Sequence, residues 1–307
     1  MSKILVTGGA GFIGSTLVDK LINEGNEVVV IDDLSSGKKS YINPQAKFYE
    51  LDICSPKVAK MFAKEKFDFV YHLAAQIDVR KSVASPEYDN RINVLGGLNI
   101  IENCRQNQVK KIIFSSTGGA IYGEAEEIPT PETYFTYPLS PYGIHKLTLE
   151  KYLNYYHQVY GLNYTVLRFA NVYGPRQFKG GEAGVIALFI ENAVKGAESL
   201  QFGDGQQTRD FVYVDDVVHG LFLALEIDCC GEINIGSEIE TNLLDIRRDI
   251  EKALGEPMKI KELPGKLGEQ RRSCLSYQRA KTVLNWAPQV TLEEGIKRTI
   301  AWTKNIQ

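Results

Sequence analysis

The chain has 307 residues, long enough to bury a large core and to form two domains or one extended α/β unit. A formal net charge of −3 gives no basic footprint for nucleic acid, and no apolar run approaches the roughly 20 residues that span a bilayer. The five cysteines lack C-x-x-C spacing, so we expect reduced thiols and no metal site. The chain enters its first predicted strand at Lys3 without a signal peptide, so we expect a cytoplasmic protein.

The first predicted unit is a strand at 3–6, a glycine-rich turn and a helix that runs through about residue 22. Gly8, Gly11 and Gly14 have a spacing that is a variant of the dinucleotide-binding fingerprint. In this context Gly8 permits a tight turn, Gly11 lets the backbone approach a pyrophosphate, and Gly14 allows close packing of helix and strand. The helix N-terminus then faces the negative charge.

A second predicted strand, 27–31, ends in Asp32 and Asp33, about 20 residues beyond the glycines. An acid at this place accepts hydrogen bonds from the adenosine ribose hydroxyls, and it repels a 2′-phosphate. The pattern therefore favours NAD over NADP. The alternative is that Asp32 only caps a turn.

Strands and helices continue to alternate through the first half of the chain. The further predicted strands are 47–53, 67–73, 110–116 and 163–169, and the predicted helices are 56–66, 86–106 and 141–160. Such alternation with apolar strands predicts a Rossmann-type, doubly wound parallel sheet, with ligands at the carboxyl ends of the strands. Glycine- and proline-rich loops after Asn171 predict a smaller, irregular α+β module that closes over a substrate cleft.

Tyr142 and Lys146 lie one helical turn apart, so their side chains share a face of the helix that begins near Pro141. A neighbouring ammonium favours the phenolate of a tyrosine, which then accepts a proton near neutral pH. The pair indicates proton abstraction from an alcohol. The alternative is a chance pair on a solvated helix.

Several motifs in order along the chain are specific to one family. They are Thr7 to Gly14, His72 to Gln76, Ser116 to Gly123, Tyr142 with Lys146, Asn171 to Arg176, and Arg209 to Val217. On these residues the chain resembles the extended short-chain dehydrogenase/reductases, and among them the NAD-dependent sugar-nucleotide epimerases. The resemblance implies 4-epimerisation of a UDP-hexose, either UDP-glucose and UDP-galactose alone or also their N-acetyl forms, through a 4-keto sugar.

The resemblance also implies roles for individual residues. Tyr142 is the base, Thr117 hydrogen-bonds the same sugar oxygen, and Lys146 holds the nicotinamide ribose and lowers the pKa of Tyr142; Ser115 and Ser116 remain alternatives for the catalytic hydroxyl. The NAD-binding residues are Gly8, Gly11, Phe12, Ile13, Gly14, Asp32, Asp33, Ser35, Gly37, Asp52, Ile53, Leu73, Ala74, Ala75, Gln76, Asn93, Ser115, Tyr142 and Lys146. The substrate-binding residues are Val79, Thr117, Tyr142, Asn171, Gln201, Phe202, Arg209, Glu269, Arg271 and Ser273.

By the same resemblance, residues 1–170 form the NAD-binding domain, with returning segments near 210–240, and residues 171–307 mostly bind the sugar nucleotide. A homodimer is implied, formed through the helices at 86–106 and 141–160. Apolar residues available for that contact include Ile92, Leu95, Ile100, Leu149, Leu153 and Val159.

Three other functions compete with epimerisation. Sugar-nucleotide 4,6-dehydratases of this family place an Asp-Glu pair directly after the threonine, and the decarboxylases keep a glutamate nearby, whereas this chain has Gly118 and Gly119. A non-catalytic NAD sensor would be expected to lose Tyr142 or Lys146.

The small Ser273, beside the 2-substituent of the sugar by resemblance, predicts some activity on N-acetylated substrates.

Overall fold

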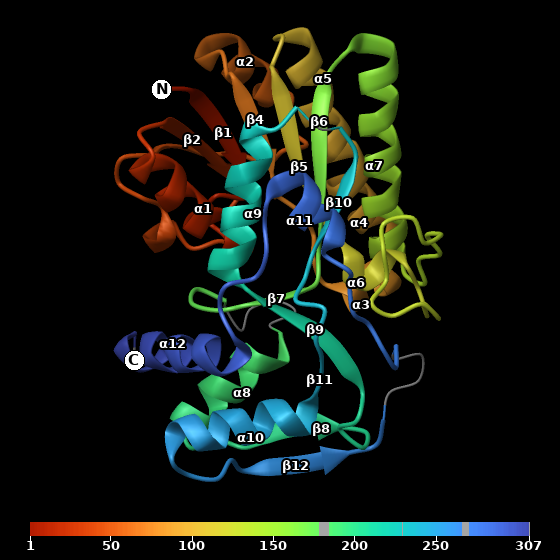
Figure 1. The fold of residues 1–307 in the computed structure, drawn as a ribbon. Helices are drawn as coiled ribbons and strands as arrows, with labels where there is room; N and C mark the ends of the chain where they lie inside the picture. The colour runs from red at the N-terminus through yellow and green to blue at the C-terminus, as the bar shows by residue number, and fades with distance from the viewer. Residues whose placement is uncertain (178–183, 229, 266–269, 307) are drawn as a thin grey trace.

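A computed structural model describes residues 1–177, 184–228, 230–265 and 270–306. Its main element is a seven-stranded sheet of order β10-β6-β5-β4-β1-β2-β3 in which all neighbours are parallel (Figure 1). The strands are β1 Lys3–Thr7, β2 Glu27–Asp32, β3 Lys47–Glu50, β4 Phe69–His72, β5 Lys111–Thr117, β6 Asn163–Phe169 and β10 Glu232–Ile235. This order is that of a doubly wound sheet, as predicted.

Helices cover both faces of the sheet (Figure 1). In β1, Ile4 and Val6 pack with helices α1 (Phe12–Asn23) and α9 (Val214–Glu226). Leu5 points to the other face and packs with α2 (Lys57–Glu65), α5 (Gly97–Gln106) and α7 (Pro141–Tyr160). Because side chains alternate along a strand, both faces of an apolar strand can be buried in this way.

The predicted helix 86–106 is not a uniform α-helix. It consists of α4 (Pro86–Asn90), a π-helical segment η2 (Arg91–Gly96) and α5, which follow one another directly. Within the π segment, the Asn93 side chain hydrogen-bonds both the N–H and the C=O of Gln76, each at 2.9 Å. Such π-helical turns are rare and are frequently found at functional sites.

The remaining short helices lie near the carboxyl ends of the strands. They are η1 Lys39–Tyr41, α3 Val79–Ala84 and α6 Gly118–Ile121. Helix α11 (Gln278–Leu284) packs against α9 and β10, so the chain returns to the large sheet late in the sequence.

A smaller α+β unit lies below the large sheet in Figure 1. A three-stranded sheet of order β11-β9-β7 contains β7 Asn171–Tyr173, β9 Thr208–Tyr213 and β11 Glu240–Asn242. A two-stranded sheet pairs β8 Ser199–Phe202 with β12 Ile260–Leu263, and the flanking helices are α8 Val185–Val194, α10 Leu243–Leu254 and α12 Leu292–Asn305.

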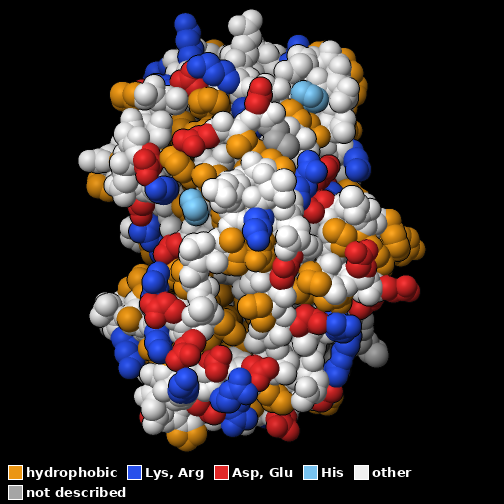
Figure 2. Space-filling view, in the orientation of Figure 1, with side chains coloured by type: hydrophobic (Ala, Val, Ile, Leu, Met, Phe, Trp, Pro, Cys, Tyr) orange, Lys and Arg blue, Asp and Glu red, His pale blue; other side chains and the backbone are white. Residues whose placement is uncertain are grey.

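The surface is mixed in charge. On the face shown in Figure 2, acidic and basic side chains are interspersed, and hydrophobic side chains gather over the loop between α6 and α7. Phe135, Tyr137 and Leu139 of that loop are each more than 60% exposed. No helix in the described ranges has both the length and the apolar character needed to cross a membrane.

Candidate functional site

A cavity of about 450 Å³ lies at the carboxyl ends of β1, β2, β4 and β5. Its wall contains the glycine turn, the end of β2, the segment after β4 and the first turns of α7. The predicted residues that line it are Gly8, Gly11, Phe12, Ile13, Gly14, Asp32, Asp33, Ser35, Asp52, Ile53, Leu73, Ala74, Ala75, Gln76, Ser115, Tyr142 and Lys146. Segments far apart in the sequence therefore meet at one edge of the sheet, as expected for a doubly wound fold.

The glycine turn is closely interlocked. Gly8 has φ +72°, and a Cβ there would lie 2.8 Å from the Ala74 nitrogen; a Cβ on Gly14 would lie 2.1 Å from the Gly8 oxygen. Gly11 caps α1 without a side-chain hydrogen bond, so the amides at the helix N-terminus remain available to an anion. This cradle fits a pyrophosphate.

Asp32 serves both the turn and the cavity. Its carboxylate accepts hydrogen bonds from the Ala10 N–H at 3.0 Å and the Leu34 N–H at 2.9 Å, and it is 8% exposed. Burial raises the pKa of Asp32, while the two amide bonds act against that rise. Each carboxylate oxygen has a second lone pair, which can accept a ribose hydroxyl.

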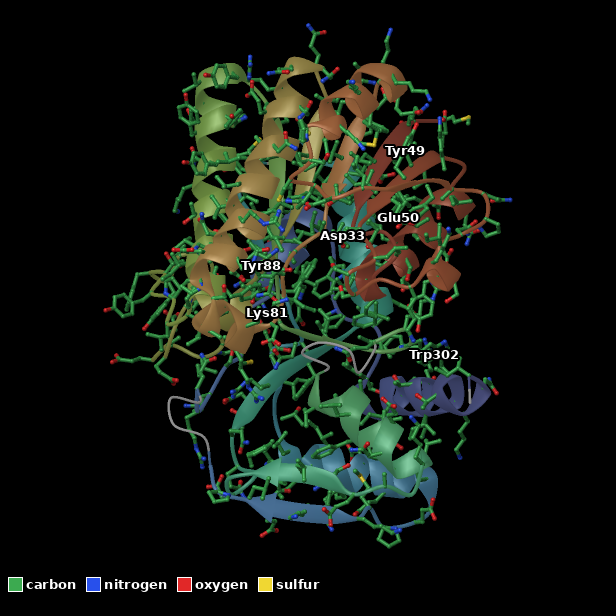
Figure 3. All side chains as sticks on the ribbon, turned by 180° about the vertical axis from the view of Figure 1, so that it is seen from behind. Asp33, Tyr49, Glu50, Lys81, Tyr88 and Trp302 are labelled. Carbon is green, nitrogen blue, oxygen red and sulfur yellow. The ribbon has the colours of Figure 1, made fainter. Side chains whose placement is uncertain are left out.

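The cavity wall also contains residues that the sequence did not single out. They are Ala10, Ser36, Tyr41, Leu51, Ile77, Asp78, Lys81, Tyr88, Phe169, Arg176 and Gln177. The wall also includes Ser116, the alternative catalytic hydroxyl, and Ile92, which was expected at the dimer contact. Figure 3 shows Lys81 and Tyr88 near each other on the rear face, and the Lys81 Nζ lies 4.3 Å from the centroid of the Tyr88 ring. Arg176 ends a recognised motif and Gln177 follows it, and this position in the sequence was the signal that could have found them.

Two polar atoms in this wall have no hydrogen-bond partner within the described part of the chain. They are the Arg176 Nη1 and the Gln177 Oε1, and both are buried. A buried donor and acceptor left unpaired cost stability unless a ligand or water satisfies them. They support a polar ligand in the cavity.

Lys146 lies at the inner end of the cavity and is 3% exposed. Its Nζ donates a hydrogen bond to the Ser115 carbonyl at 2.8 Å and lies 6.0 Å from the centroid of the Tyr142 ring. Burial lowers the pKa of Lys146 to about 8, against the opposing effects of Asp89 and Glu150. Two of the three predicted catalytic side chains, Tyr142 and Lys146, are therefore brought together in the wall of one cavity, whereas Thr117 is not among the residues that line it.

A buried ion pair supports the end of β5. Arg168 donates to both carboxylate oxygens of Glu150, at 3.1 and 2.6 Å, and the Ser116 hydroxyl donates to the same carboxylate at 2.5 Å. Ser116 is thus committed to a buried network. The next residue, Thr117, is half-buried, and its hydroxyl lies 4.0 Å from where a Cβ on Gly119 would stand.

Some predicted residues lie outside the cavity wall. Gly37 packs behind Asp32, since a Cβ there would lie 2.8 Å from the Asp32 Oδ1. Asn93 acts through the Gln76 backbone, and Val79 begins α3. Asn171 begins β7 near the end of β5, with its Oδ1 3.5 Å from the Cβ position of Gly119.

Other predicted substrate-binding residues lie in the smaller unit, around the turn between β8 and β9. Gln201 and Phe202 end β8, and Arg209 is the second residue of β9. Arg271 forms a two-bond ion pair with Asp204 in this turn, at 3.0 and 2.9 Å, and Ser273 follows it. Glu269 lies outside the described residues.

Fold and cavity together define a dinucleotide-binding protein of the Rossmann type. Within the described ranges, no three His, Cys, Asp or Glu side chains are grouped so as to hold a metal ion. Residues 4–236 match the model of the NAD dependent epimerase/dehydratase family, and the chain belongs to this family.

Known proteins resemble the chain over nearly its whole length. It is 45% identical over 304 residues to a putative UDP-glucose 4-epimerase of Methanocaldococcus jannaschii, which covers 98% of both chains. The crystal structure of UDP-glucose 4-epimerase from Thermotoga maritima with UDP-glucose has a TM-score of 0.97 at 47% identity, covering 99% of both chains. That of the Thermus thermophilus enzyme with NAD has a TM-score of 0.94 at 39% identity, covering 98% of this chain and 99% of that one. The predicted family, fold class and NAD-dependent enzyme class are confirmed.

Proposed function

We propose that this protein interconverts UDP-hexoses that differ in configuration at C4, with NAD held in the cavity throughout. The observation that carries the proposal is the placement of Tyr142 and Lys146 in the wall of the cavity that the glycine turn closes. The similarity to UDP-glucose 4-epimerases over the whole chain supports the choice of substrate.

The side chains divide the work at C4 of the sugar. Tyr142 accepts the proton of the C4 hydroxyl, and Thr117 donates a hydrogen bond to the same oxygen. The buried ammonium of Lys146 stabilises the phenolate form of Tyr142. NAD, when bound, would supply the acceptor for the C4 hydride and, in its reduced form, the hydride for the opposite face of the 4-keto sugar.

We assign the cavity-lining residues and the groups behind them to the cofactor. The assignment covers residues 1–170 together with α9 and β10, which return to the large sheet. The rest of 171–307 is assigned mostly to the sugar nucleotide, with Asn171 and Arg209 on the diphosphate. Asn171 pairs with Phe211, two residues from Arg209, so both side chains share a face of the sheet.

Epimerisation is favoured over dehydration and decarboxylation by the groups beside Thr117. Gly118 carries no carboxylate, and a Cβ there would lie 2.3 Å from the Leu275 Cδ1, so any side chain at this position would have to displace Leu275. Glu150 lies behind Ser116, but its two oxygens are held by Arg168. Because its oxygens are engaged by Arg168 and Ser116, Glu150 is not placed as the acid or base that dehydration or decarboxylation needs.

Incubation of the purified protein with UDP-galactose, without added reductant, tests the proposal. We expect net conversion to UDP-glucose, and chromatography of the nucleotide sugars measures it. A stable 4-keto product from UDP-galactose contradicts epimerisation and indicates dehydration. Absence of turnover indicates a non-catalytic NAD-binding protein.

Acceptance of N-acetylated substrates follows from Ser273, whose small side chain leaves room beside the 2-substituent. We expect measurable epimerisation of UDP-GlcNAc in the same assay. Turnover of UDP-glucose with none of UDP-GlcNAc contradicts this part of the proposal. Ser273→Tyr is expected to remove the N-acetyl activity and keep the activity on UDP-glucose.

We also propose a homodimer formed through α7 and the helical segment beside it. Ile144, Tyr155 and Val159 follow one face of α7 and are about half exposed, and Leu95 of η2 is 54% exposed. Ile100, Leu149 and Leu153, which were expected to be available for this contact, are instead buried within the protomer. These three pack against the sheet because they lie on the inner faces of their helices.

Sedimentation velocity at micromolar concentration tests the dimer. We expect Leu95→Glu to shift the wild-type dimer toward monomer, because it places a charge in the apolar contact. Ile239→Glu, at a position in the smaller unit that is also more than half exposed, is the matched control and should leave the dimer intact. A wild-type monomer contradicts the proposal.

The cytoplasm is the proposed location. The four cysteines within the described ranges, Cys54, Cys104, Cys230 and Cys274, are free thiols, and the cytosol keeps thiols reduced.

A further inference from the structure

Asp89 of α4 has a carboxylate that is buried behind the cavity. Its Oδ1 accepts a hydrogen bond from the Gln76 Nε2 at 2.6 Å, and its Oδ2 accepts one from the His145 Nδ1 at 2.5 Å. The side chain of Asp89 is 0% exposed. A buried carboxylate is costly unless it is paired, so its two partners define what it does.

The first partner, Gln76, belongs to the cofactor loop, which we define as residues 74–78 after β4. Asn93 hydrogen-bonds both backbone groups of Gln76, and the Gln76 Oε1 accepts from the Asp78 N–H at 2.7 Å. The Gln76 Nε2 also donates to the Asp78 carbonyl at 2.8 Å. Asp89 therefore completes a closed network that fixes the loop against the cavity.

The second partner, His145, precedes Lys146 on α7. The same part of α7 is held a second time from α3, where the Ser82 hydroxyl, itself buried, accepts a hydrogen bond from the Tyr142 N–H at 3.1 Å. Two contacts from the segment 79–90 thus fix the turn of α7 that carries both proposed catalytic side chains.

Asp89 also contributes charge to the surroundings of Lys146. The titratable groups that act on this ammonium are Asp89 from α4, Glu150 and Tyr142 from α7, and His72 from β4. Glu150 is neutralised by its ion pair with Arg168, and burial together with the Lys146 charge lowers the pKa of His72 to about 3. The two hydrogen-bond partners of Asp89 are an amide and an imidazole, neither of which carries a permanent positive charge.

We propose that Asp89 is a positioning residue that fastens the catalytic turn of α7 to the cofactor loop and keeps Lys146 in its ammonium form. The role rests on the proposed function, because it acts on the reaction only through Lys146 and Tyr142. A carboxylate at this place opposes the loss of the Lys146 proton that burial favours.

Asp89→Asn tests the charge, since it keeps the shape of the side chain. We expect the alkaline limb of the kcat profile to move to lower pH by about one unit, so that activity falls roughly tenfold more between pH 6.5 and 8.5 than in the wild type. Glu87→Gln removes a charge from the exposed face of the same helix and should keep the wild-type profile. A profile of Asp89→Asn parallel to the wild type, with kcat lowered equally at every pH, overturns the proposal.

His145 supplies a second test that leaves Asp89 in place, and it decides the matter if Asp89→Asn does not fold. His145→Arg sets a permanent cation beside the carboxylate and is expected to move the alkaline limb in the same direction. His145→Asn keeps a donor near the Nδ1 position without a charge and should leave the limb unmoved. An unshifted limb in His145→Arg overturns the proposal, whereas absence of epimerisation by the wild type overturns the proposed function instead.

Discussion

The turn between β8 and β9, with Arg271 beside it, is the site we propose for the substrate, and we call it the substrate turn. It differs from the cofactor cavity in how its polar groups are supplied. In the cavity, the groups are largely backbone amides and strand ends that packing holds in place, as where Gly14 lies against the Gly8 oxygen. In the substrate turn, they are long side chains. Arg271 is more than half exposed and is paired with Asp204.

This difference bears on how each region meets its ligand. Backbone groups fixed by interlocked glycines change little when a ligand binds, so the cavity is prepared for a cofactor that stays bound. An exposed ion pair contributes little to stability, so a diphosphate can replace Asp204 on Arg271 at small cost. The cavity is expected to retain its ligand, and the substrate turn to exchange it.

The largest effect is expected at Tyr142, in the wall of the cofactor cavity. Tyr142→Phe removes the proton acceptor, and kcat for UDP-galactose is expected to fall about a thousandfold with NAD still bound. The measurement is steady-state turnover together with NAD released on denaturation. Tyr160→Phe, on the exposed end of the same helix, is the matched control. A Tyr142→Phe variant with more than a tenth of wild-type kcat contradicts the proposed mechanism.

Gly14→Ala tests whether the interlocked turn is what retains the cofactor. Its Cβ would lie 2.1 Å from the Gly8 oxygen, so the turn must move, and we expect the NAD content to fall at least tenfold with a loss of about 1–3 kcal/mol in stability. Gly25→Ala is the comparison, because φ at Gly25 is +79° and a Cβ there would have none of the surrounding described atoms within 4 Å, its own residue and two chain neighbours apart. It should lose about 1 kcal/mol and keep its NAD. Equal NAD content in the two variants contradicts the comparison.

The same difference decides how much the sequence could predict. The cavity follows from local signals, because a strand that ends in a glycine turn places Gly8, Gly11 and Gly14 by chain geometry alone. Helix α7 was predicted with its observed ends, where Ser140 caps the N-terminus and Gly161 the C-terminus. The π segment at 91–96 was missed, because its cause is a contact between Asn93 and a loop 17 residues away. The pairing of Arg271 with Asp204 joins residues 67 positions apart and leaves no local pattern.

His72 gives a pH test of the cavity side alone. Its ring is 1% exposed and lies 2.8 Å from the Thr7 hydroxyl, and burial and Lys146 lower its pKa to about 3. Below about pH 6.5 this histidine takes up a proton in the unfolded chain but not in the native chain. The free energy of unfolding therefore decreases as the pH is lowered, by about 2 kcal/mol between pH 6.5 and 4.5.

His72→Asn is expected to remove this part of the pH dependence while keeping a polar partner for Thr7. The measurement is urea unfolding at both pH values, and equal m-values would show that the unfolded states are comparable. If the variant loses as much stability as the wild type over this interval, His72 is not the titrating group.

The smallest effect, and the sharpest test of the substrate turn, is the difference between its two arginines. The Arg209 side chain lies on the same face of β9 as that of Phe211, which pairs with Asn171 of β7. The Arg209 Nη1 donates a hydrogen bond to the Thr208 carbonyl at 2.8 Å. Arg209→Ala is expected to raise KM for UDP-galactose roughly tenfold with kcat little changed, because the diphosphate is bound equally before and during hydride transfer. Arg271→Ala should raise KM by less, because in the wild type the ligand must first displace Asp204. Asp204→Asn should then lower KM through the freed Arg271, and an unchanged KM in this variant would show that Arg271 does not bind the diphosphate.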